Sequence, residues 1–161
     1  MTLPRLFAIA ILSLCPGLTA QAGGKKGEES GISFHLQGDP SDNPKMIFEQ
    51  FNAGQKMVFR RNPDFLTKDI AAFNPFPSQD GQGFGAVLQL TPSAKNRLAA
   101  ITTANTGRWM LTVVNGRKID AVIIDKEVTD GYLVIWKGIG AAEIDAFDKT
   151  VPRIGESKPR R

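Results

Sequence analysis

Two β-rich runs separated by Asn115-Gly116 constrain the fold of this chain more than any other feature. Trp109 to Val114 and Arg117 to Ile124 are rich in branched and aromatic residues, which favour strands. Asn-Gly between such runs is the strongest short hairpin signal, because both central residues of the tight turn need a positive φ angle. The sequence therefore predicts an antiparallel hairpin over 109–124.

The segments around this hairpin predict an alternation of strands and helices. Gly85–Leu90 has the composition of a strand, and Thr91-Pro92 then begins a helix, since the threonine hydroxyl can cap free amides and proline suits the first helical position. Gly107 is available to end that helix. Tyr132–Trp136 is predicted to be the next strand and Ala141–Val151 the last helix. This order predicts an α+β fold, with two helices packed on one face of a largely antiparallel sheet.

The first half of the chain carries weaker signals. Short strands are predicted at Ile32–Leu36, Met57–Arg60 and Asp69–Phe73. Met46–Phe51 fits either a strand or one helical turn. Asn74–Gly83 holds two prolines and two glycines, so a loop is predicted there.

The first 22 residues have the pattern of a cleavable secretory signal peptide. Arg5 supplies one positive charge, and an apolar run from Leu6 to Leu18 follows it. Ala20 and Ala22 fit the small-x-small site after which signal peptidase cuts. The run is shorter than the ~20 residues that a membrane-spanning helix needs. We therefore expect an exported protein, periplasmic or secreted.

Cys15, the only cysteine, leaves a lipoprotein signal as an alternative. Leu14 precedes it, however, where that signal requires a small residue. Cleavage after Ala22 would remove Cys15 and leave residues 23–161 without a thiol, which suits an oxidising compartment. Within that chain we expect a flexible leader at 23–31, a single α+β domain at 32–151 and a polar basic tail at 152–161.

Charge and hydropathy exclude some classes of partner. The chain has 20 Lys and Arg against 16 Asp and Glu, a net charge of +4 at pH 7. These charges are dispersed and do not form the concentrated basic stripe of a nucleic-acid-binding protein. After residue 22 no apolar run is long enough to cross a membrane. We expect a monomer that binds neither nucleic acid nor a cofactor.

Residues able to support catalysis or metal binding are sparse. His35 is the only histidine, and no metal-ligand spacing occurs. Gly81–Gly85 is glycine-rich, but it precedes a strand and lacks the lysine and hydroxyl of a phosphate-binding loop. The carboxylates of Asp120–Asp130 lack calcium-loop spacing and would scatter over several faces. The sequence therefore predicts no enzyme, with no catalytic, cofactor-binding or metal-binding residue.

One face of the hairpin is a candidate binding surface. Strand alternation gives it four apolar side chains: Trp109, Leu111, Val113 and Val122. Lys118 and Asp120 share this face, and the opposite face is slightly more apolar, so we expect the opposite face to meet the helices. The Trp109 face would then be a partly exposed apolar surface, of the kind that marks binding sites.

A series of turn and cap motifs in the second half occurs in the order of a known family. The motifs are Val87–Thr91, Arg97–Gly107 with Asn105-Thr106-Gly107, Leu111–Ala121 with Asn115-Gly116 and Ile119-Asp120-Ala121, Val128–Gly131 with Ile135 and Gly138, and Glu143-Ile144. In this order they resemble the head of the first periplasmic domain of SecD and SecDF, accessory membrane subunits of the bacterial Sec protein-export channel. The resemblance covers 85–151, about half of residues 23–161. Lys68–Ile70 weakly resembles the strand that leads into it.

Three positions depart from the family pattern. Asn115, Val122 and Asp130 stand where the family usually has aspartate, proline and glycine. The membrane helices that harness the proton gradient in SecD-like proteins find no counterpart in this sequence. The resemblance therefore does not imply that mechanism, and it carries over no catalytic residue.

The resemblance implies a role in binding a polypeptide, because the head in SecD-like proteins is thought to contact an emerging chain. We expect a non-enzymatic exported envelope module that binds protein or extended peptide, with envelope or translocating proteins as partners. A small-ligand-binding or hydrolytic domain, using a pocket between residues 31–82 and the sheet, remains the alternative. Converging Asp or Glu side chains would be its signature. A structural protein without a discrete ligand is the third reading.

Overall fold

The computed structural model describes residues 31–52 and 54–160. The expected signal peptide, with Ala20 and Ala22, and nearly all of the expected leader lie outside this range.

A four-stranded antiparallel sheet forms the centre of the fold. Its order is β4–β1–β7–β8, with β1 at Ile32–Leu36, β4 at Phe65–Leu66, β7 at Trp109–Val114 and β8 at Arg117–Ile123. Asn115 and Gly116 join β7 to β8, at φ angles of 49° and 75°. The hairpin predicted from Asn-Gly is confirmed.

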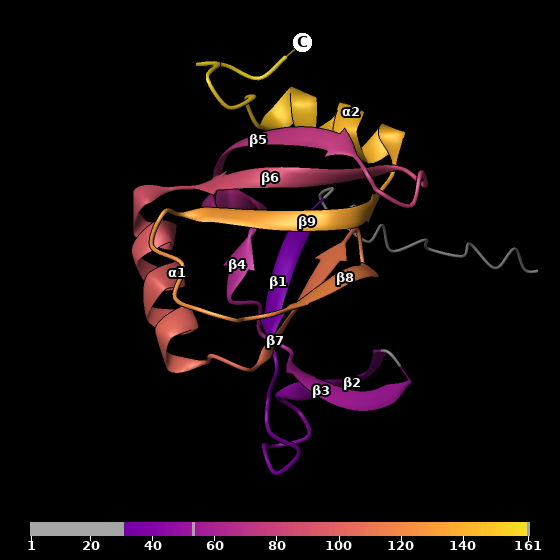
Figure 1. The fold of residues 1–161 in the computed structure, drawn as a ribbon, viewed down its shortest axis with the longest axis vertical. Helices are drawn as coiled ribbons and strands as arrows, with labels where there is room; N and C mark the ends of the chain where they lie inside the picture. The colour runs from indigo at the N-terminus through magenta and orange to yellow at the C-terminus, as the bar shows by residue number, and fades with distance from the viewer. Residues whose placement is uncertain (1–30, 53, 161) are drawn as a thin grey trace, which may run out of the picture.

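A second antiparallel sheet, β5–β6–β9, crosses over the first (Figure 1). It comprises β5 at Ile70–Pro77, β6 at Phe84–Leu90 and β9 at Tyr132–Ile139, and a short 3-10 helix, η1 at Thr67–Asp69, precedes β5. The loop predicted at 74–83 is wrong for 74–77, because β5 continues through Pro75 and Pro77. Proline is tolerated there because β5 is an edge strand, and a missing N–H on the outer side breaks no ladder.

Two helices complete the α+β fold. In α1 (Pro92–Ala104) the Thr91 hydroxyl accepts from the Ala94 amide at the predicted cap, 3.4 Å away. In α2 (Ala141–Thr150) the Glu143 carboxylate accepts from the Gly140 amide at 2.8 Å. Figure 1 shows α1 along one side of the molecule and α2 beyond β5.

The main core lies between the two sheets and takes in the apolar sides of both helices. Its largest fully buried members are Phe65, Phe73, Ile32, Leu36, Leu88, Leu98, Ile135, Ile139 and Val114. Ile144 and Phe147 of α2 join it, and the rings of Phe73 and Phe147 pack 5.9 Å apart. The α+β class and the largely antiparallel pairing predicted from the sequence are confirmed, although the strands divide among three sheets.

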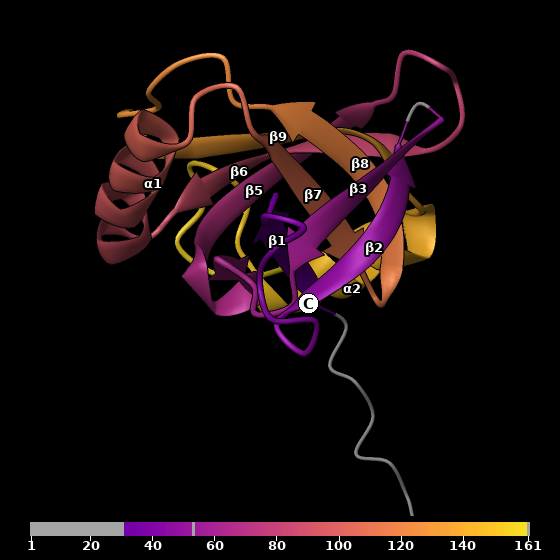
Figure 2. The same cartoon turned by 90° about the horizontal axis from the view of Figure 1, so that it is seen from below.

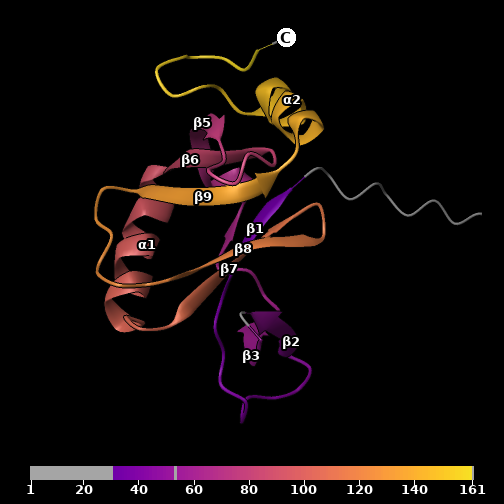
Figure 3. The ribbon, with the colours of Figure 1, turned by 45° about the vertical axis from the view of Figure 1, so that its right-hand side comes forward.

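The third sheet is the hairpin of β2 (Ile47–Asn52) and β3 (Gln55–Arg60). It resolves the ambiguous 46–51 segment as a strand. Figures 2 and 3 show that this hairpin lies on the side of the central sheet away from β5–β6–β9. The β2–β3 hairpin therefore covers the second face of the central sheet.

The segment after α2 is anchored at its start. Phe73 donates its amide to the Pro152 carbonyl at 3.0 Å, and Ile154 donates to the Phe73 carbonyl at 3.1 Å. The Arg153 guanidinium lies 4.5 Å from the centre of the Phe73 ring and forms two hydrogen bonds with the Asp148 carboxylate. Residues 152–154 of the expected polar tail are thus packed on β5, whereas 155–160 are exposed.

Candidate functional site

A β-bulge in the β7–β8 hairpin rearranges the face predicted from strand alternation. Val113 pairs with Lys118, but Thr112 pairs with Asp120, so the register shifts by one residue. Beyond the bulge Val122 lies opposite Met110 and packs against the main core, while Ile123 lies opposite Trp109. The placement of Val122 with Trp109 is therefore wrong, because one extra residue in a strand exchanges the faces of all residues after it.

The other predicted members of the face have different surroundings. Leu111 is only 3% exposed, because it shares the face of its β1 partner His35, which is covered by the β2–β3 hairpin. Trp109 and Val113 are half-buried. The β2–β3 hairpin thus covers most of the surface that was expected to be exposed. Of the predicted residues, Trp109 lies at the edge of this hairpin.

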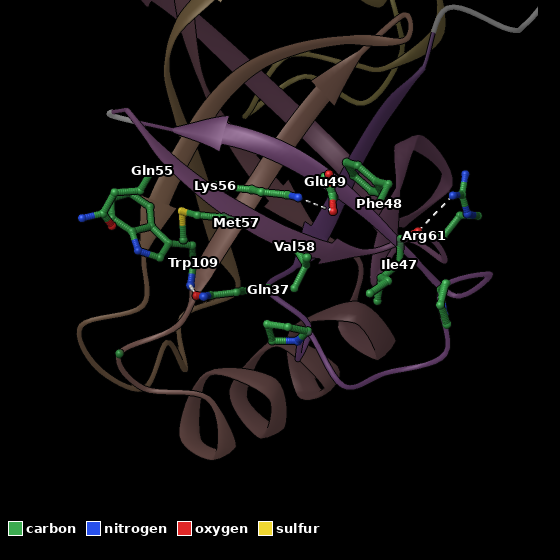
Figure 4. Close-up of a pocket in the computed structure, with 13 residues that line it drawn as sticks. Gln37, Ile47, Phe48, Glu49, Gln55, Lys56, Met57, Val58, Arg61 and Trp109 are labelled. Atoms are coloured by element: carbon green, nitrogen blue, oxygen red, sulfur yellow. Dashed lines mark hydrogen bonds and ion pairs between the residues drawn. The ribbon is translucent and has the colours of Figure 1, made fainter.

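A groove of about 930 Å³ opens at that edge, between the β2–β3 hairpin, the loop after β1 and the start of β7 (Figure 4). Its lining residues come mainly from the first half of the chain: Gln37, Pro40, Pro44, Ile47, Phe48, Glu49, Gln55, Lys56, Met57, Val58, Arg61, Gly107 and Trp109. A pocket between residues 31–82 and the sheet was expected for the alternative function, and this groove lies there.

The wall of the groove is held by specific polar contacts. The Gln37 side-chain oxygen accepts from the Trp109 amide at 3.0 Å, which fixes the start of β7 against the loop after β1. The Arg61 guanidinium donates to the carbonyls of Lys45 and Ile47, at 3.1 and 2.9 Å. These contacts give the groove a defined shape.

The charged groups of the groove are largely paired. Lys56 Nζ lies 2.7 Å from Glu49 Oε1 across the β2–β3 ladder, and both side chains are more than half exposed. Glu49 is the only carboxylate among the lining residues, so the converging acids expected for a hydrolase do not occur at this groove. In the described part of the chain no group of three or more His, Cys, Asp or Glu could hold a metal ion.

One edge of β3 remains open beside the groove. The hairpin is a two-stranded sheet, and within the described residues its outer edge adds only an isolated bridge, Gln37 to Phe59. Gly38 donates its amide to the Val58 carbonyl at 3.0 Å, next to that bridge. The stretch from Gln55 to Met57 continues this edge past Trp109.

His35 is a structural residue that connects the central sheet to the β2–β3 hairpin beneath the groove. Its Nδ1 lies 2.8 Å from the Arg60 carbonyl and its Nε2 lies 2.9 Å from the Ser33 hydroxyl. Burial lowers the pKa of the imidazole, against the smaller raising effects of the Arg60 carbonyl and the Asp64 charge.

Sequence reasoning missed the β2 and β3 residues that form most of the groove. For β2 the segment Met46–Phe51 fitted either a strand or a helical turn, and for β3 a strand was predicted at Met57–Arg60, but neither signal indicated a groove. Their position on the central sheet depends on contacts far apart in sequence.

No helix in the described ranges is long and apolar enough to span a membrane.

Comparison with known proteins gives a likeness in structure only. No protein-family model matches the sequence, and no curated protein matches it either. A solved structure of SecDF, described as a membrane component that enhances protein export, matches 74% of this chain at 20% identity with a TM-score of 0.52. A second SecDF structure, in a super-membrane-facing form, matches 73% at 19% identity with a TM-score of 0.51.

The matched regions make up 62% and 18% of those two SecDF chains, so this chain corresponds to a part of them. The resemblance to SecDF in residues 85–151 is thereby confirmed at the level of fold. Because the match covers 74% of the chain, the similarity in fold also includes residues outside that segment. The chain described here has a SecDF-like fold.

Proposed function

We propose that this chain is a non-enzymatic, exported module of the cell envelope that binds an extended segment of another protein. The open edge of β3 beside Trp109 is the observation that carries the proposal. An extended segment can pair with such an edge through its main chain while alternate side chains enter the adjoining groove. Envelope or translocating proteins are the proposed partners.

The backbone of β3 has the geometry for strand addition. A strand residue directs its N–H and C=O to the same edge, and alternate residues share that edge. The Val58 carbonyl accepts from Gly38 on the outer edge, so Lys56, two residues earlier, directs its backbone groups outward as well. A segment laid beside Lys56 would continue the ladder that Gly38 begins.

The side chains around this edge suit segments of varied sequence. Pro40, Pro44 and Ile47 offer apolar surface, and the indole of Trp109 offers a large flat one. The Lys56–Glu49 pair adds no net charge. The Arg61 guanidinium, which donates to backbone carbonyls, leaves the lining with one net positive charge. Such a groove would take apolar side chains, with a slight preference for acidic flanking residues.

The likeness to SecDF supports a role in the cell envelope. SecDF enhances protein export, and this chain shares the fold of part of it. Export of this chain itself rests on the signal-peptide pattern at 1–22. N-terminal sequencing of the protein recovered from the periplasm of producing bacteria would test it, with Gly23 as the expected first residue. Retention of Met1 in the cytoplasm would contradict export.

Site-specific crosslinking would test the binding groove. A photo-crosslinking amino acid is placed at Gln55 in the full-length chain, and a matched one at Tyr132, an exposed residue on β9 that does not line the groove. The purified proteins are irradiated with a reduced, unfolded secretory polypeptide. We expect several-fold more crosslinked product from position 55, and a strong loss when Trp109→Ala is combined with it.

Equal crosslinking from both positions would contradict the groove as the binding site. Unchanged crosslinking from position 55 in the Trp109→Ala background would contradict the role of the indole. Circular dichroism of each variant checks that the fold is retained, since Trp109 is half-buried.

A further inference from the structure

A second exposed tryptophan lies on the β5–β6–β9 sheet, away from the groove. Trp136 is 53% exposed although it stands within β9. More than half of its surface is therefore free to contact a ligand.

The indole is held by neighbours on two adjacent strands. The ring of Phe76 on β5 packs edge-on against it, with 6.2 Å between ring centres and 68° between planes. Phe76 can lie there because β6 has Gly85 beneath it: a Cβ at 85 would meet Phe76 Cζ at 2.4 Å and the Ile135 carbonyl at 2.5 Å. The glycine, the phenylalanine and the tryptophan thus form a supported aromatic platform across three strands.

Polar side chains surround one side of this platform. Gln79 and Asp80 from the β5–β6 loop join Trp136 and Lys137 in lining a hollow of about 330 Å³. This volume is at the lower end of the range for small-molecule sites, roughly 300–1,000 Å³. Figure 1 shows the β5–β6 loop beyond the end of β9, far from the β2–β3 hairpin.

The loop that supplies the polar side chains is itself fixed. Asp80 Oδ1 accepts from the Ser78 hydroxyl at 2.5 Å and from the Gln82 amide at 3.0 Å, and Ser78 donates its amide to the Gly83 carbonyl at 3.1 Å. These hydrogen bonds lower the pKa of the Asp80 carboxyl, so it is an ionised acceptor at neutral pH. A preformed loop reduces the entropy lost when a ligand binds.

The hollow does not suit a bound strand. The Trp136 amide already donates to Asp120 Oδ2 at 2.9 Å, so the outer edge of β9 is occupied at this point. A ligand must therefore be held by the four side chains.

Those side chains define the chemistry of the ligand. The flat indole face binds apolar C–H groups through dispersion and its electron-rich face. Asp80 accepts hydrogen bonds, Lys137 donates them and Gln79 does both. One negative and one positive charge favour a ligand without net charge. A neutral sugar ring combines a C–H face with hydroxyl groups around its rim.

We infer that Trp136, Gln79, Asp80 and Lys137 form a binding site for a neutral saccharide. The sugar ring stacks on the indole, and its hydroxyls hydrogen-bond the three polar side chains. This site is separate from the proposed peptide groove, and neither depends on the other.

Tryptophan fluorescence would test the site directly. The chain has two tryptophans, so in the full-length Trp109→Phe variant the emission reports on Trp136 alone. Chitotriose and maltotriose are titrated as probes, and calorimetry on the unmutated protein gives an independent dissociation constant. We expect a saturable change in emission, and a calorimetric signal that Trp136→Ala abolishes.

Two further variants separate a saccharide site from nonspecific effects. Asp80→Asn should weaken binding about tenfold, since hydrogen bonds to charged acceptors are stronger than neutral ones. Tyr132→Ala, on the same strand but outside the hollow, should leave the dissociation constant unchanged. Absence of saturable binding by both sugars would overturn the inference, as would binding that persists in Trp136→Ala.

Discussion

The imidazole of His35 and the ring of Phe48 pack edge to face, with 5.4 Å between ring centres and 86° between planes. His35 belongs to the central sheet and Phe48 to the hairpin that covers it, so the pair lies at the joint between them. Lys118 Nζ lies 5.3 Å from the centre of the Phe48 ring. The hairpin, and with it the groove, depends on an aromatic joint that contains a titratable group.

The stability of the fold is expected to fall as the pH drops below about 6.5, the ordinary pKa of histidine. Burial lowers the pKa of His35 in the folded state, so the unfolded chain binds the proton more tightly. The contribution of His35 is therefore fully present above the unfolded pKa and is lost as the pH falls through the folded one. Thermal unfolding between pH 7.5 and 5 would measure it.

His35→Gln is the control for this pH dependence. Because His35 is the only histidine, its replacement should flatten the unfolding temperature over this pH range. A slope that is the same in both proteins would show that another group is responsible.

The register shift in the β7–β8 hairpin predicts a large effect for one substitution and a small effect for its neighbour. Val122 packs against the core, so Val122→Lys should destabilise the fold by about 2 kcal/mol or more, by placing a charge against apolar neighbours. Ile123 is 51% exposed, so Ile123→Lys should change stability by no more than about 0.5 kcal/mol. Urea unfolding compares the two. The reverse order would place Val122 on the exposed face.

Gly138 is expected to be sensitive to substitution for two physical reasons. Its φ angle is 90°, and a Cβ there would lie 2.8 Å from the Cβ of Ile119. Gly138→Ala should therefore cost about 1–2 kcal/mol of backbone strain and about 1–3 kcal/mol of overpacking. Gly107 is the matched control, because its φ angle is 85° and no atom lies within 4 Å of a Cβ placed there. Gly107→Ala should therefore show the cost of backbone strain alone. Equal losses in the two variants would argue against close β8–β9 packing.

The contact between Arg153 and β5 predicts a role for the C-terminal segment in stability. The side chains of Arg153 and Asp148 are 13% and 19% exposed, and the guanidinium also stacks on Phe73. Arg153→Ala should destabilise the fold by about 1–3 kcal/mol, because it leaves a partly buried carboxylate without its partner. Arg160→Ala removes an exposed pair with Glu156 and should leave the unfolding curve unchanged. Deletion of residues 155–161 without loss of stability would agree with this division.

Local sequence was sufficient where a short segment determines its own geometry. Asn115-Gly116 formed the predicted turn because its backbone angles are a property of those two residues. Thr91-Pro92 began the predicted helix for the same reason. The order of these signals also determined the α+β class and the likeness to the SecDF head.

Local sequence was insufficient where the position of a strand at the edge of a sheet, or a β-bulge, overrode the structure that the residue types favour. Pro75 and Pro77 indicated a loop, yet they lie in β5, because only an edge strand can accommodate them and edge position is set by the whole sheet. Val122 changed face because the bulge at Ile119 and Asp120 depends on the packing of β8 near β9 and is not encoded by alternation.

Both candidate sites were decided by tertiary structure. The sequence by itself determined the helices and strands within residues 85–151, the turn between β7 and β8, and the scarcity of catalytic residues. The groove requires residues 37–52 and 54–61 to fold over the face that includes Leu111, and the hollow requires Phe76, Gly85 and Trp136 to meet across three strands. Such contacts between distant segments arise from burial of apolar surface over the whole chain, which no local pattern specifies.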